Sequence, residues 1–129
     1  MNIKPRGKYV DAFVMPVKKS NLEDYLKLAK KCSKIWLEHG AIEYVECVGT
    51  NIFMDYGTPF PKLAKLKKDE VCVFSWIVYK SMANQKSVMK KVLADKRLAQ
   101  MQDPKNMPFD MNKMSHGGFS MLVTSKKNK

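Results

Sequence analysis

The feature that most constrains the fold of this chain is an apolar run at residues 71–81. Within it, residues 71–79 include one polar side chain, Ser75, among valine, isoleucine, cysteine and aromatic residues. This composition is typical of a strand that is buried on both faces. Ser81 follows where its hydroxyl can accept a hydrogen bond from an N–H that the first turn of a helix leaves unpaired. The run therefore predicts a central strand that leads directly into a helix.

Patterns before this run predict a strand and a helix. Residues 9–17 alternate between two faces, as the side chains of a strand do. Ser20 and Glu23 have the spacing of a capping box, in which each side chain pairs with the other residue's backbone N–H at the start of a helix. Apolar residues then recur every three or four positions as far as Leu37, and Gly40 can end the helix because glycine readily adopts a positive φ.

The remaining segments predict two more strands and further helical pieces. Residues 42–48 predict a strand, and the long loop that follows either covers a site, contacts a partner or is only pinned to the core. Asp95 is placed to cap a short helix after the one that Ser81 starts. A last strand is expected at residues 115–124, where paired glycines suit a bulge, a bend or a close approach.

This order predicts an α+β fold, the ferredoxin-like βαββαβ sandwich, with a four-stranded antiparallel sheet and two helices on one face. Residues 1–125 are expected to form a single domain and residues 126–129 a basic tail. Two helices leave the other sheet face bare, and the side chains expected there, among them Phe13, Met15 and Tyr44, are too apolar for water. A homodimer that pairs two such faces is therefore expected.

Charge and cysteine content favour some classes of protein over others. The net charge of +12 invites nucleic-acid binding, but the basic residues are almost all lysine, with only Arg6 and Arg97 as arginines, so nucleic acid is an unfavoured partner. No stretch is apolar enough to cross a membrane or to act as a leader, so we expect a cytoplasmic protein. The cysteines, odd in number and far apart, predict buried thiols, with no disulfide, metal site or cofactor; they are Cys32, Cys47 and Cys72.

The sequence contains no strong catalytic motif, so the candidate site rests on scattered polar residues. Strand alternation could bring Asp11, Glu46, Ser75 and His116 to one face, where His116 would act as a base or ligand oriented by a carboxylate. The alternative is a histidine hydrogen-bonded at a strand edge, with carboxylates paired to lysines. We therefore keep two hypotheses: a regulatory or structural dimer without a ligand, or a small-molecule pocket between the paired sheets, lined by Asp11, Phe13, Tyr44, Glu46, Trp76 and His116.

Several stretches resemble one bacterial family, the YbaA-like proteins, which carry domain of unknown function 1428. The matching stretches are residues 9–14, 39–44, 74–81 and 103–110, with Gly117, Gly118 and Phe119. The resemblance implies a dimeric α+β barrel, an architecture shared with antibiotic-biosynthesis monooxygenases. It implies no activity, because the family has no established catalytic residues. Ala12, where a glycine is usual, and the lysine-rich C-terminus depart from the family pattern.

Overall fold

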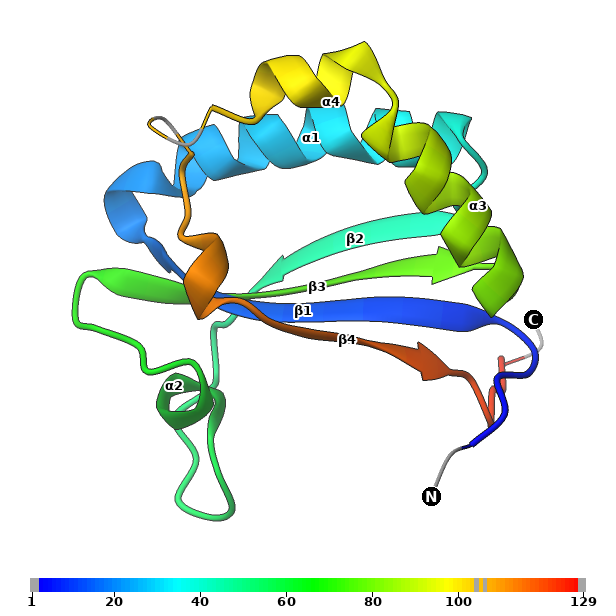
Figure 1. Cartoon of the computed structure of the whole chain (residues 1–129). Coiled ribbons are helices and arrows are strands. Elements are labelled where there is room, and N and C mark those ends of the chain that lie inside the picture. Colours follow the sequence, from blue (N-terminus) through cyan, green and yellow to red (C-terminus); the bar gives the residue numbers. More distant parts are fainter. Residues whose placement is uncertain (1–2, 104, 106, 128–129) are drawn as a thin grey trace.

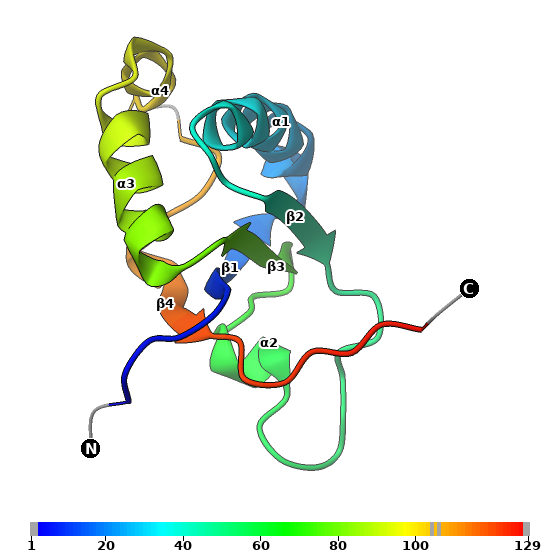
Figure 2. The same ribbon diagram turned by 90° about the vertical axis from the view of Figure 1, so that its right-hand side faces the viewer.

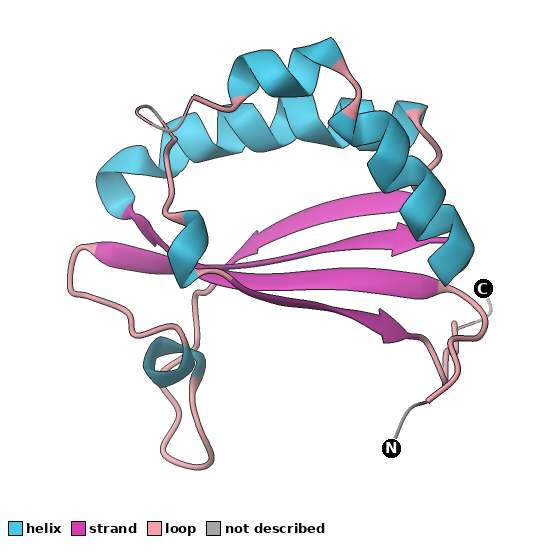
Figure 3. Cartoon of the chain, viewed as in Figure 1, coloured by secondary structure: helices cyan, strands magenta, loops and turns pink. Residues whose placement is uncertain are grey.

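The protein is described by a computed structural model covering residues 3–103, 105 and 107–127. One antiparallel sheet runs in the order β2-β3-β1-β4 and is covered by helices on one face (Figures 1 and 3). The strands are β1 (Tyr9–Lys18), β2 (Glu43–Val48), β3 (Glu70–Tyr79) and β4 (Ser115–Ser120). The covering helices are α1 (Leu22–Glu38), α3 (Met82–Leu93) and α4 (Lys96–Met101). This arrangement confirms the predicted α+β class.

The opposite face of the sheet carries no long helix. A short helix, α2 (Phe60–Leu63), lies in the loop between β2 and β3, and this loop projects to the side away from the covering helices (Figure 2). We call the sheet surface on that side the bare face. Short 3-10 turns at Lys19–Asn21 and Met111–Lys113 precede α1 and β4. Within the described residues, no helix is long and apolar enough to cross a membrane.

Side-chain caps set the start of two of the helices, α3 and α4. The Ser81 hydroxyl accepts from the Asn84 backbone N–H at 3.0 Å, and the Asp95 carboxylate accepts from the Arg97 N–H at 2.9 Å, as predicted. The predicted capping box at Ser20 is wrong, because the 3-10 turn moves the start of α1 to Leu22, after an Asn21 that makes no side-chain cap. Gly40 follows the C-cap residue of α1 and has a φ of +115°, so it ends the helix as predicted.

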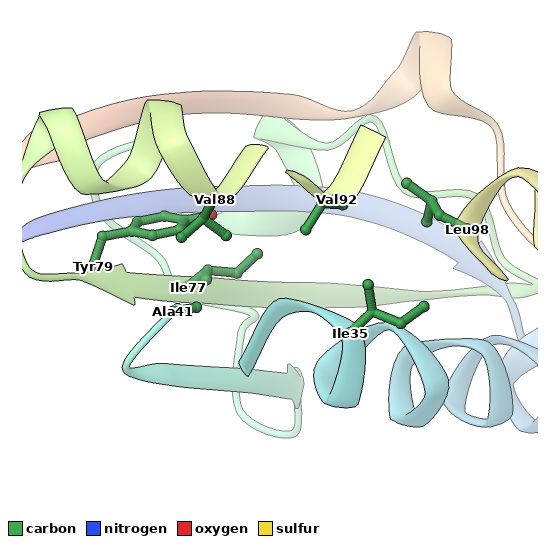
Figure 4. Packing of buried hydrophobic residues seen from close by; sticks show 7 residues of the cluster. All are labelled: Ile35, Ala41, Ile77, Tyr79, Val88, Val92 and Leu98. Atoms are coloured by element: carbon green, nitrogen blue, oxygen red, sulfur yellow. The ribbon is translucent and has the colours of Figure 1, made fainter. Parts of the chain in front are cut away.

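A tightly packed cluster joins α3 to the centre of the sheet (Figure 4). Val88 and Val92 of α3 and Tyr79 of β3 are each 0% exposed, and each buried apolar side chain of this size stabilises the fold by roughly 1.5–3 kcal/mol. Leu93 is exposed, because it lies one position beyond Val92 and faces away from the sheet. A second cluster packs α1 on β1 and β3, through Tyr25, Ala29, Met15, Val17 and Val73.

Strand register decides which side chains meet the helices. Phe13 pairs with Ser75, and Tyr44 with Ile77, and these positions share a face with the buried Met15 and Val73. The prediction that Phe13, Met15 and Tyr44 occupy the bare face is therefore wrong, since they lie beneath the helices. The bare face instead presents the strand residues that alternate with those beneath the helices, including Phe74, Trp76 and Phe119.

Two further sequence predictions differ from the structure. Cys72 is buried and Cys32 is half-buried, but Cys47 is exposed because it lies on the edge strand β2 and points to the bare face. The last strand ends at Ser120 instead of residue 124. The predicted basic tail at 126–129 lies partly outside the described residues.

Candidate functional site

A cavity of about 150 Å³ lies between the helix-covered face of the sheet and helices α1 and α4. Its floor comes from alternate residues of three strands, such as Phe13, Glu46 and Ser75. Its walls and roof come from α1, from α4 and from residues that precede β4. A cavity of this size accommodates a molecule about as large as benzene. The cavity therefore belongs to one subunit, and it is not on the bare face, where the sequence prediction had placed a pocket.

Aromatic and methionine side chains supply most of the cavity lining. The rings of Trp36 and Tyr44 lie 6.1 Å apart at 58°, and those of Tyr25 and Phe109 lie 5.6 Å apart at 86°. Rings at such angles give an apolar surface with partly negative faces. Thioether side chains, which adapt easily to the shape of a neighbour, complete much of the lining; they are Met15, Met101, Met107 and Met114.

Glu46 of β2 brings a carboxylate into this apolar surrounding. The Tyr25 hydroxyl donates to its Oε1 at 2.7 Å, and the hydroxyls of Tyr44 and Ser75 lie near enough to lower its pKa. Burial raises the pKa of Glu46, while these three hydroxyl groups oppose the rise. Among the described residues, no lysine, arginine or histidine forms an ion pair with Glu46. The carboxylate is thus held by hydroxyl groups and not by a counter-charge.

The other titratable groups around Glu46 stay neutral at ordinary pH. Burial, reinforced by the nearby carboxylate, raises the pKa values of the Tyr25 and Tyr44 phenols. The same two causes raise the pKa of Cys32 to about 11, which leaves the thiol protonated and a poor nucleophile. Glu46 is therefore the group best placed to carry charge in the cavity.

Trp36, which lines the cavity, has a buried indole N–H without a hydrogen-bond partner among the described residues. Its interaction with the Tyr79 hydroxyl falls short of hydrogen-bond geometry. An unpaired buried donor of this kind costs about 1–3 kcal/mol. This indole is therefore a polar group in the cavity wall whose hydrogen-bonding capacity is unused.

The residues predicted from sequence as one site fall into three places. Phe13, Tyr44 and Glu46 line the cavity. Asp11 and His116 share the same sheet face but lie outside that lining. Trp76 points to the bare face, where its indole N–H donates to Glu43 at 3.2 Å.

Asp11 and His116 form a separate polar group near the β4 edge of the sheet. Gln85 of α3 donates to the Asp11 carboxylate at 3.2 Å. Burial raises the pKa of Asp11, opposed by hydrogen bonds from Gln85 and Tyr79 and by the charge of His116. The His116 ring stacks on Phe13 with centroids 6.2 Å apart, and the residue is exposed. His116 is exposed and Asp11 is half-buried, so this group is partly open to solvent.

Sequence reasoning missed the helical half of the cavity. Tyr25, Cys32 and Trp36 belong to the apolar stripe of α1, which predicts core packing and does not reveal a space. Met101 ends the short helix expected after Asp95, and Met107, Phe109 and Met114 come from the stretch before the last strand, which reads as a loop. A concentration of methionines in that stretch was the available signal, because methionine is common at adaptable binding surfaces.

Comparison with known proteins places the chain in a family. The family described as "Protein of unknown function (DUF1428)" matches residues 8–111, a range that includes every cavity residue except Met114. "Uncharacterized protein YbaA" of Escherichia coli (strain K12) is 33% identical over 116 residues, covering 90% of this chain and 97% of that protein. The protein of the same name from Shigella flexneri matches to the same extent. The chain therefore belongs to the YbaA-like DUF1428 family of proteins of unknown function, as its sequence motifs predicted.

Proposed function

We propose that this protein binds a small, compact organic molecule in the cavity between the sheet and helices α1 and α4. The observation that carries the proposal is the lining itself, in which aromatic and methionine side chains surround one carboxylate and its hydroxyl partners. Small-molecule sites generally combine apolar walls with a few convergent polar groups in this way. No second subunit is needed to complete such a site.

The energetic cost of the cavity favours a binding role over simple core packing. Core volume that side chains leave unfilled destabilises a fold, and the space between the sheet and the helices here is about 150 Å³. Domains are typically stable by only about 5–15 kcal/mol. A structural module without a ligand would gain stability from larger side chains here, so the retained space supports the binding hypothesis.

The two tryptophans of the chain allow a direct test, because they lie on opposite faces of the sheet. In a Trp76→Phe variant, Trp36 in the cavity wall is the only tryptophan. We expect its fluorescence to change when the protein is titrated with a panel of benzene-sized compounds. In the matched Trp36→Phe variant the emission of Trp76 should stay constant. A panel that leaves Trp36 silent while native mass spectrometry finds no co-purified molecule would refute the proposal.

We also propose that two copies pair through their bare faces, giving a dimeric α+β barrel from two ferredoxin-like subunits. The strand order and the family resemblance support this architecture. A row of aromatic rings supports the choice of surface: the exposed rings of Phe74 and Phe60 lie 5.9 Å apart, and Phe74 lies 5.7 Å from the half-buried Trp76. Phe119 of β4 is 57% exposed on the same face. Contiguous exposed apolar surface of this kind marks interaction sites.

Light scattering coupled to size exclusion tests the pairing. We expect a dimer mass for the unaltered chain and a monomer mass for Phe74→Lys, because the lysine would place a charge in an apolar interface. Leu93→Lys, at an exposed leucine on the far side of α3, is the matched control and should remain dimeric. A monomeric unaltered chain would refute the pairing and leave the cavity proposal intact.

The free thiols of all three cysteines fit our expectation of a reducing, cytoplasmic environment.

A further inference from the structure

We infer that the molecule bound in the cavity is a compact organic cation of the methylated ammonium class, with Glu46 as its counter-charge. This inference rests on the proposed function, namely that the cavity holds a small molecule. It adds the chemical class of that molecule. Three features of the cavity support it: the charge of its lining, the arrangement of its rings and its size.

The charge of the lining is the first support. The chain carries 24 lysines and arginines, but no described lysine or arginine lines the cavity, and Glu46 is the one carboxylate among the lining residues that the structure describes. Glu46 is half-buried and forms no ion pair with any described residue. Removing a carboxylate from water without a counter-charge is costly. A bound cation would supply the missing charge, whereas a bound anion would be repelled.

The hydroxyl groups around Glu46 suit this role. Tyr25 donates to the carboxylate, and the nearby hydroxyls of Tyr44 and Ser75 also lower its pKa, so all three favour its ionised form against the effect of burial. They approach from α1, from β2 and from β3, and they fix the carboxylate without neutralising it. A carboxylate that is oriented but not neutralised is complementary to a cation.

The aromatic residues of the lining are the second support. A cation within about 6 Å of an aromatic ring is attracted to the ring's electron-rich face, and sets of such rings are used to bind quaternary ammonium groups. Here two ring pairs come from different elements, Trp36 with Tyr44 and Tyr25 with Phe109, each with its rings strongly inclined. Rings that are inclined to one another can contact a roughly spherical ion on several sides at once.

Size is the third support. The cavity of about 150 Å³ accepts a molecule of benzene size, and tetramethylammonium is close to that size. Its methyl groups would contact the thioethers and rings of the lining, so the ion would lose little by leaving water compared with a bare metal ion or a primary ammonium group. The cavity is therefore more suited to a methylated ammonium than to a strongly hydrated cation.

A pair of probes of equal shape tests the charge requirement on the full chain. Tetramethylammonium and tert-butanol differ chiefly in charge, and their affinities can be measured by calorimetry at constant ionic strength. We expect tetramethylammonium to bind at least about tenfold more tightly than tert-butanol. Glu46→Gln should remove most of that preference while changing the tert-butanol affinity by less than about twofold.

The outcomes separate this inference from the proposal on which it rests. If tert-butanol binds as tightly as tetramethylammonium, the cavity is a binding site but the cation inference is wrong. If neither probe binds and Trp36 responds to no compound, both fail. Tetramethylammonium binding that is unchanged in Glu46→Gln would place the ion elsewhere and also overturn the inference.

A second measurement needs no variant. The affinity of the unaltered protein for tetramethylammonium should fall as the pH is lowered and Glu46 becomes protonated, while the affinity for tert-butanol stays flat. The other titratable groups facing Glu46 are Tyr25 and Cys32 from α1 and Tyr44 from β2, and all three remain neutral there because burial raises their pKa values. Ser75 from β3 does not titrate. A tetramethylammonium affinity that is independent of pH would contradict the inference.

Discussion

Filling the cavity from α1 should stabilise the protein. Ala29 lines the cavity and is only 6% exposed, so a leucine there would occupy space that is otherwise empty. Burying the added carbons contributes about 2.4 kcal/mol, at about 0.8 kcal/mol for each. Lost rotamer freedom of about 0.5–1 kcal/mol and some repacking strain oppose this gain. We expect Ala29→Leu to raise the free energy of unfolding by about 1 kcal/mol, or Tm by roughly 3–5 °C.

The matched control is Ala83→Leu on α3, at an exposed helical position. It carries the same change in helix propensity without adding buried volume, so its effect should stay within about 0.5 kcal/mol. Urea unfolding followed by circular dichroism gives both values, with the slope m confirming that the transition is unchanged. The filled variant should also lose binding of small probes. If Ala29→Leu destabilises the fold by more than about 1 kcal/mol while Ala83→Leu is neutral, the site lacks room for a leucine and the reasoning fails.

Three other measurements address separate features. Because burial raises the pKa of Glu46, the folded state binds the Glu46 proton more tightly than the unfolded state does. The contribution of Glu46 to the free energy of unfolding is therefore greatest below its pKa in the unfolded chain, and it declines as the pH rises through its pKa in the folded chain. The stability of the unaltered chain relative to Glu46→Gln should therefore fall with rising pH over that window, and a constant difference would contradict the shift. Gly118→Ala should destabilise the fold by about 1–3 kcal/mol in urea unfolding, because its Cβ would lie 2.7 Å from Cζ of Tyr9; Gly117→Ala, whose nearest contact is 3.8 Å, is the control, and equal effects would refute the account. In a chain lacking Cys47 and Cys72, the alkylation rate of Cys32 should rise with pH towards a midpoint near its pKa of about 11; a midpoint at 9 or below would show that burial does not control the thiol.

Local chemistry made much of the fold predictable. The Ser81 and Asp95 caps and the positive φ of Gly40 each depend on a few neighbouring atoms, and all three were predicted correctly. The capping box at Ser20 failed because a 3-10 turn competes for the same residues. The close approach expected at the paired glycines is made by Gly118, which lies against the Tyr9 ring.

The site was less predictable because it depends on long-range packing. Alternation divides the residues of β1 into two faces, but both faces are apolar enough to be covered, so Phe13 and Met15 were assigned to the wrong one. The cavity exists because side chains of α1, α4 and the residues before β4 do not quite meet those of the sheet. Such a mismatch has no periodic signature in the sequence, whereas the apolar stripe of α1 that surrounds it does.

The alternation within β3 has a further consequence for how proteins of this family can diverge. Ser75 and Ile77 face the cavity, while Phe74 and Trp76, the residues between and before them, face the opposite side. A shift of this strand changes the cavity lining and the bare face together, so the sequence of β3 is constrained by both surfaces. The cavity residues of α1, of α4 and of the segment before β4 lie on the helix-covered side of the sheet and do not form part of the bare face. Selection for a different ligand can therefore proceed through the roof of the cavity while the sheet, and any assembly built on it, stays unchanged.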